Sequence, residues 1–171
     1  MVLDWGYNVL VVDYRSFGKS GGELLGENQL YADAEQIYAF ARALDYRNEE
    51  IILYCYSMGV AMVCHLASRK GAKAVIMESG YSSVDEMEFA KGLCPSYPLN
   101  NAEKAKHILI PALVIHGELD EVITVDHAER IWENLASDVK EINILTGGGH
   151  GDLKGMAGYA GFINGFIDRL G

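Results

Sequence analysis

Ser57, Asp120 and His150 are the residues of this sequence whose types and order could carry out nucleophilic chemistry. A serine hydroxyl attacks well only when a histidine takes its proton, and that histidine needs an acid to fix its tautomer and stabilise its charged form. The chain supplies nucleophile, acid and histidine in one of the orders in which such triads occur. The three residues therefore predict acyl transfer through a covalent intermediate, with no metal and no organic cofactor.

Ser57 lies where an apolar run, 51–53, gives way to an apolar helical pattern after Gly59. A serine on such a strand-to-helix corner is held out of the sheet, and the free N–H groups of the new helix point at a developing oxyanion. We therefore expect the backbone N–H of Met58 to be one oxyanion donor. Cys55 replaces the first glycine of a Gly-x-Ser-x-Gly pattern. The alternative for Ser57 is a simple helix N-cap.

Asp120 and His150 each follow an expected strand, at 112–116 and 141–145. Loops beyond the carboxyl ends of parallel strands share one face of the sheet, so both side chains can meet Ser57 there. Aspartate is also a common turn residue, and Glu118 and Glu121 are nearby rivals for the acid. We expect His116 to brace the turn that carries the acid. The remaining histidines are expected to be structural or solvated, namely His65, His107 and His127.

Segments rich in Val, Ile and Leu alternate with helical periodicity along the whole chain. Five of them are expected strands, namely 8–14, 50–55, 72–78, 112–116 and 141–145. Apolar residues recur at helical spacing between Leu30 and Leu44 and between Tyr159 and Leu170. This alternation predicts one α/β domain over residues 1–171, a parallel sheet of about five strands with helices on both faces. Tyr14, Tyr56 and Tyr81 flank strand exits and are candidate substrate-binding residues.

The composition excludes several classes of function. With 14 basic and 24 acidic residues the net charge is −10, which argues against nucleic acid as a partner. The sequence has no apolar run long enough to span a bilayer and no signal-peptide pattern, so we expect a soluble cytoplasmic protein. Its three cysteines have no paired spacing, which favours reduced thiols over disulfides or a zinc site.

Three further segments carry a resemblance to a known family: Asp13-Tyr14-Arg15-Ser16-Phe17-Gly18-Lys19-Ser20-Gly21-Gly22, Glu78-Ser79-Gly80-Tyr81-Ser82-Ser83 and His116-Gly117-Glu118-Leu119-Asp120. Together with the serine corner, they make the chain similar to the α/β-hydrolase superfamily, closest to its lidless Bem46-like and acyl-peptidase-like serine hydrolases. The first segment resembles the family's Asp-Tyr-Arg-Gly-Tyr-Gly-x-Ser-x-Gly loop, with Ser16 in place of a glycine. The resemblance covers nearly the whole chain.

The resemblance also implies that the family's opening strands, with the loop that supplies a second oxyanion donor, precede Met1. Losing one such donor costs about 10²–10³ in rate. In relatives a strand from that portion lies between those expected at 9–12 and 51–53. We therefore expect these two strands to pair directly, a homodimer to cover the exposed edge, or the chain to be the carboxyl-terminal part of a longer protein.

Three functions remain open at this point. The first is hydrolysis of a carboxylic ester or thioester, with a small acyl compound as substrate. The second is a peptidase or amidase on the same scaffold, which the resemblance makes less favoured because peptide-cleaving relatives carry a second glycine where this chain has Val60. The third is a catalytically impaired fragment or binding domain that lacks the second oxyanion donor.

Overall fold

A parallel four-stranded sheet forms the centre of the protein, in the order β1-β2-β3-β4. The structure is a computed structural model that describes residues 6–87 and 97–171. The strands are β1 (Ile52–Tyr56), β2 (Ala74–Glu78), β3 (Ala112–Gly117) and β4 (Lys140–Leu145). Each pairs with the next in parallel register, so all four carboxyl ends meet at one edge of the sheet. Four of the five expected strands are thus confirmed.

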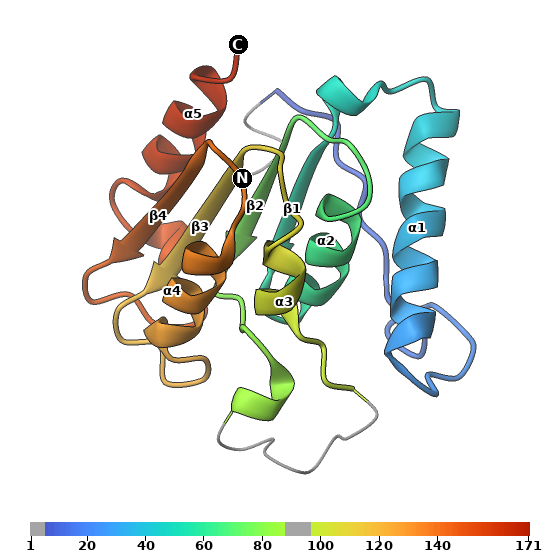
Figure 1. Cartoon of the computed structure of the whole chain (residues 1–171), viewed down its shortest axis with the longest axis horizontal. Coiled ribbons are helices and arrows are strands. Elements are labelled where there is room, and N and C mark those ends of the chain that lie inside the picture. The colour runs from blue at the N-terminus through green and yellow to red at the C-terminus, as the bar shows by residue number, and fades with distance from the viewer. Residues whose placement is uncertain (1–5, 88–96) are drawn as a thin grey trace.

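Helices cover both faces of the sheet, as predicted, but unequally (Figure 1). The helices are α1 (Glu27–Ala43), α2 (Val60–Ala67), α3 (Asn101–Ala105), α4 (Val125–Asn134) and α5 (Tyr159–Asp168). One core packs α2, α3 and α4 against side chains such as Val75 and Met77, with α1 lying on α2. The other packs α5 against the alternate side chains, such as Ile76 and Leu113. The central strands β2 and β3 are buried on both faces, which explains why their sequences are almost entirely apolar, whereas β1 and β4 are partly exposed.

The segment 8–14 does not form the predicted strand. It has no assigned secondary structure, and residues 8–13 make no backbone-to-backbone hydrogen bond with other described residues. Its side chains are largely exposed, with Val11 81% accessible. A β-strand exists only when a neighbour accepts its backbone hydrogen bonds, and β1 pairs with β2 alone within the described part of the chain. The direct pairing of 9–12 with 51–53 is therefore wrong, and a homodimer covering this edge stays a prediction.

The loop that follows this segment has the backbone shape expected of a glycine-rich turn. Ser16, which replaces a family glycine, has a φ of 66°, in the left-handed region that glycine adopts most easily. Gly18 packs directly against the Asp13 carboxylate. Arg15 joins the loop to α1 through two hydrogen bonds to Asp33, of 2.9 and 2.6 Å.

None of the helices in residues 6–87 and 97–171 combines the length and the apolar character needed to cross a bilayer. Cys55 and Cys64 are buried free thiols. Burial raises the pKa of both, so each is far less reactive than an exposed thiol. Cys94 lies outside the described residues. No group of three or more metal-ligating side chains comes together in the described ranges.

Candidate active site

Ser57 occupies a sharp corner between β1 and α2. The strand ends at Tyr56, a single 3-10 turn covers Ser57–Gly59, and α2 begins at Val60. Ser57 has a φ of 52°, a conformation that is rare for a residue with a side chain and that clusters at functional sites. Gly59 packs closely under the corner, because a Cβ there would lie 3.1 Å from the Cys55 Cβ, which is tighter than ordinary contact. The corner therefore has the geometry that the sequence pattern predicted.

The structure brings Ser57, His150 and Asp120 into one hydrogen-bonded chain. The Ser57 Oγ lies 2.9 Å from His150 Nε2, and His150 Nδ1 lies 2.7 Å from Asp120 Oδ2. An ionised carboxylate only accepts, so Nδ1–H donates to Asp120 and Nε2 is left to accept the serine proton. The Asp120 carboxylate is fully buried, whereas the His150 ring is partly open to solvent.

Asp120 is held at both of its carboxylate oxygens, and His116 Nε2 lies 3.3 Å from the same Oδ2 that faces His150. Its Oδ1 accepts the backbone N–H groups of Val122 and Ile123, at 2.9 and 2.8 Å. His116 donates Nε2–H to the Ile123 carbonyl at 2.7 Å, so it braces the turn as expected. The rival Glu118 points elsewhere, since its Oε2 accepts the Gly147 N–H at 3.0 Å. Asp120 is thus the carboxylate that His150 contacts.

The backbone N–H of Met58 lies in the first turn after the corner. Backbone N–H groups in the first turn of a helix have no helical acceptor, which leaves them available to an anion. Burial of the Cys55 thiol on the strand before it keeps that side chain away from this position. The arrangement fits one oxyanion donor, and the source of a second donor stays a prediction.

The histidine loop passes so close to β3 that only glycine fits at position 117. A Cβ on Gly117 would lie 2.4 Å from the Gly148 carbonyl oxygen and 2.7 Å from that of Gly149. Both contacts are with backbone atoms, which cannot move aside without shifting the loop. Gly117 therefore sets how near His150 comes to the turn that carries Asp120.

We expect Gly117→Ala to lower kcat/KM on an activated ester about 100-fold, because a displacement of about 1 Å at a catalytic group has that order of cost. The matched control is Gly161→Ala in α5, where a Cβ meets nothing within 4 Å. Ester assays with both variants, beside urea unfolding, separate a shifted loop from an unfolded protein. Equal activity in the two variants would contradict this role for Gly117.

The three tyrosines proposed as substrate-binding residues lie in different environments. Tyr56 is at the site, with its ring centroid 5.3 Å from that of His150. Tyr14 packs against the core, and its hydroxyl would lie 3.2 Å from a Cβ at Gly59. Tyr81 is only 3% exposed, within the core of α1–α4. Only Tyr56 therefore lies beside the triad.

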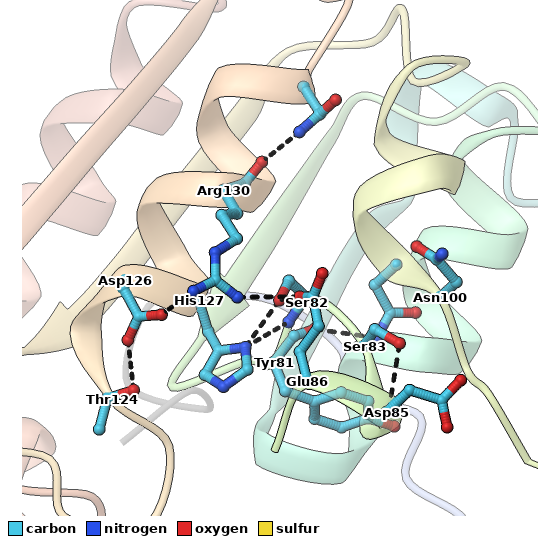
Figure 2. Close-up of polar contacts among 12 residues, drawn as sticks. Tyr81, Ser82, Ser83, Asp85, Glu86, Asn100, Thr124, Asp126, His127 and Arg130 are labelled. Carbon is cyan, nitrogen blue, oxygen red and sulfur yellow. Dashed lines mark hydrogen bonds and ion pairs between the residues drawn. The ribbon is translucent and has the colours of Figure 1, made fainter. Parts of the chain in front are cut away.

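Two histidines that the sequence placed outside the site are buried in polar clusters. His65 donates its Nε2–H to the Glu35 carboxylate at 2.8 Å, and its ring stacks on Tyr31. His127 was expected on a surface helix, yet its ring is buried and points from α4 at Ser82 (Figure 2). Its Nδ1 lies 2.6 Å from the Ser82 Oγ and accepts the Ser82 N–H at 3.3 Å. This cluster pins the segment after β2 to α4.

These buried histidines make stability depend on pH. Burial lowers the pKa of His65, His116 and His127. The unfolded chain, with an ordinary histidine pKa of about 6.5, then binds more protons than the folded one below that pH. The free energy of unfolding should be greatest above about pH 6.5. It should fall as the pH drops from 6.5 toward 5, by up to about 1.4 kcal/mol per pH unit for each histidine.

Urea unfolding at pH 7.5, 6.5, 5.5 and 5.0 measures this dependence. His127→Gln removes one titrating group and should flatten the profile. A free energy of unfolding that stays constant from pH 7.5 to 5.0 would contradict the prediction.

Comparison with known proteins identifies the family and the fold of the chain. Residues 2–95 match the family model described as serine aminopeptidase, S33. The chain is 32% identical over 166 residues to the α/β hydrolase domain-containing protein aho-3 of Caenorhabditis elegans, which covers 94% of this chain and 49% of that protein. It is 31% identical over 167 residues to the human α/β hydrolase domain-containing protein 17B, and this match covers 95% of this chain and 57% of that protein. The chain thus spans about half the length of these relatives.

Solved structures show the same fold at low sequence identity. An esterase of Pyrococcus furiosus has a TM-score of 0.78 and 19% identity, over 99% of this chain and 72% of that one. A monoacylglycerol lipase of Paleococcus ferrophilus has a TM-score of 0.70 and 16% identity, over 92% and 80%. From its corner serine, its parallel sheet and its match to the S33 model, this chain belongs to the serine aminopeptidase S33 family of the α/β-hydrolase superfamily.

Proposed function

We propose that this chain is a serine hydrolase that cleaves a carboxylic ester or thioester through an acyl-enzyme intermediate. The observation that carries the proposal is the unbroken chain from Ser57 Oγ through His150 to Asp120, at 2.9 and 2.7 Å. Hydrogen-bonded contact between nucleophile, base and orienting acid is the arrangement that activates a serine. The fold and the family support a hydrolase in general.

The chemistry follows from these positions. Ser57 Oγ attacks the acyl carbon while its proton passes to His150 Nε2, and the carbonyl oxygen becomes an oxyanion beside the Met58 N–H. The carbon–oxygen or carbon–sulfur bond to the leaving group breaks, and Nε2–H protonates that group as it departs. Water then attacks the acyl-serine with His150 as base, which releases the acid and restores Ser57. Asp120 keeps the imidazole tautomer and stabilises its charged form throughout.

A fluorophosphonate probe, followed by mass-spectrometric mapping, tests the serine. We expect labelling at Ser57, and hydrolysis of p-nitrophenyl esters by the same preparation. Labelling at another serine, or none with a folded protein, would reject the proposal and favour a binding domain.

Peptide or amide hydrolysis is the second candidate, favoured by the name of the matching family model and by acylaminoacyl peptidases among proteins of the same fold. Val60 stands against it, because peptide-cleaving relatives carry a second glycine there. Aminoacyl and acyl-aminoacyl p-nitroanilides, assayed beside the esters, decide between the two. A larger kcat/KM on the anilides would make the peptidase the function.

Association is the remaining question for activity. If a second copy covers the open β1 edge and supplies an oxyanion donor, specific activity should fall about 10²–10³-fold on dilution into monomer. Light scattering beside an ester assay over a concentration series measures this. A fully active monomer would show that the second donor lies within these residues.

A further inference from the structure

The loop that carries His150 has little conformational restraint of its own. Four of its residues are glycines, in Gly147-Gly148-Gly149-His150-Gly151. Glycine has the largest backbone freedom of any residue, so ordering such a loop costs more entropy than ordering any other. Only a few bonds within the loop region oppose this, such as Gly148 N–H to the Leu145 carbonyl at 3.0 Å. The position of His150 must be fixed by contacts from outside the loop.

Two hydroxyl groups from neighbouring strands meet at the backbone carbonyl of His150. The Tyr56 hydroxyl donates to this oxygen at 3.0 Å, and the Ser79 hydroxyl donates to it at 3.3 Å. Tyr56 is the last residue of β1 and Ser79 directly follows β2. Both lone pairs of the carbonyl are therefore used, and the residue is tied to the carboxyl ends of two strands at once.

Both donors are themselves held in place. Ser79 is completely buried, has a φ of 48°, and donates its backbone N–H to the Ile115 carbonyl at 2.9 Å. A left-handed φ at a buried serine is a costly conformation that the surrounding structure maintains. Burial, followed by the nearby Glu78 carboxylate, raises the pKa of Tyr56, which keeps its hydroxyl protonated and able to donate. The Lys154 ammonium lies over the Tyr56 ring, 4.8 Å from its centroid, in cation–π contact.

We infer that Tyr56 and Ser79 are positioning residues, whose hydroxyls jointly hold the His150 carbonyl and so fix the imidazole between Ser57 and Asp120. This inference rests on the proposed function, since it assigns the two residues to the same site. When either hydroxyl is removed, the His150 carbonyl still accepts a hydrogen bond from the other. Removal of both frees a glycine-flanked residue, and the loss should exceed the product of the single losses.

The test compares Tyr56→Phe, Ser79→Ala and the double variant with two controls. Ser82→Ala removes a buried hydroxyl from the same segment, but one that contacts Glu86 and His127 instead of the loop (Figure 2). Tyr38→Phe removes a tyrosine hydroxyl that donates to Asn48 at 2.7 Å, far from the site. Ser79→Gly is a further variant for the case that Ser79→Ala does not fold, because glycine adopts the φ of 48° at this position without strain.

On p-nitrophenyl acetate we expect kcat to fall about fivefold in each single variant and about 100-fold in the double variant, with KM unchanged. The Nδ1 proton of His150, observed by NMR, should exchange faster with water in the double variant only. A double variant with kcat within twofold of the parent, or controls that lose as much, would overturn the inference. If the parent neither labels nor hydrolyses, the proposed function fails, and an unchanged Nδ1 proton in the double variant would overturn the positioning role separately.

Discussion

Ser57→Ala is expected to lower ester turnover by about 10⁶-fold and to abolish labelling by a fluorophosphonate. The substitution removes only the hydroxyl group, and loss of a triad serine costs this order of rate because the covalent pathway disappears as a whole. Measurement of kcat on a p-nitrophenyl ester and intact-mass analysis after probe treatment give the two readouts.

Ser16→Ala is the matched control for this variant. Ser16 and Ser57 both have a left-handed φ, of 66° and 52°, so alanine meets the same backbone strain at both positions. Ser16 lies in the exposed loop after 8–14 and contacts no triad residue in the described structure. Retained labelling in Ser57→Ala would mean that another nucleophile carries the chemistry.

Asp120→Asn is expected to reduce kcat by about 10⁴-fold, the cost measured when a triad aspartate becomes an amide. The contacts of Asp120 explain the direction. Its Oδ1 accepts two backbone N–H groups, so the single oxygen of asparagine should take that place and turn its NH₂ toward His150. Nδ1 must then accept, the proton moves to Nε2, and the ring can no longer take the proton of Ser57.

Glu118→Gln serves as the control for the acid. Its amide oxygen can still accept the Gly147 N–H, so kcat should remain within a few-fold of the parent. Steady-state kinetics of both variants, with labelling rates by the probe, measure the difference. Should Glu118→Gln cost more than Asp120→Asn, the carboxylate assignment is wrong.

The apolar pattern of the sequence predicted which segments could be strands but not which would find a neighbour. The strands at 52–56, 74–78, 112–117 and 140–145 each lie beside another in the sheet. The stretch Val9-Leu10-Val11-Val12 has an equally strong pattern and no strand forms. Periodicity records how well side chains can be buried, whereas a strand also requires backbone partners, and these are a property of the whole topology.

The site was predictable to the extent that strand ends share one edge. That rule brought Ser57, Asp120 and His150 together from the sequence, and their separations came only from the structure. The burial of His127 depends on the segment around Ser82, which no periodicity of α4 reveals. The positioning role of the Tyr56 and Ser79 hydroxyls could not be predicted from the sequence either, because their acceptor is the backbone carbonyl of His150, which lies far away in the chain.

The order of the sheet also has a consequence for how the site appears during folding. Each strand pairs with the next strand along the chain, and Ser57 and His150 lie at opposite ends of that series, 93 residues apart in sequence. Contacts between such distant residues form late, because the intervening chain must lose its conformational entropy before these contacts can stabilise the fold. The corner at Ser57 can thus form with β1 and α2 while the molecule is still inert. If Ser57 is the nucleophile as proposed, its reactivity toward an acylating reagent would report the arrival of β4 and so the last step of assembly.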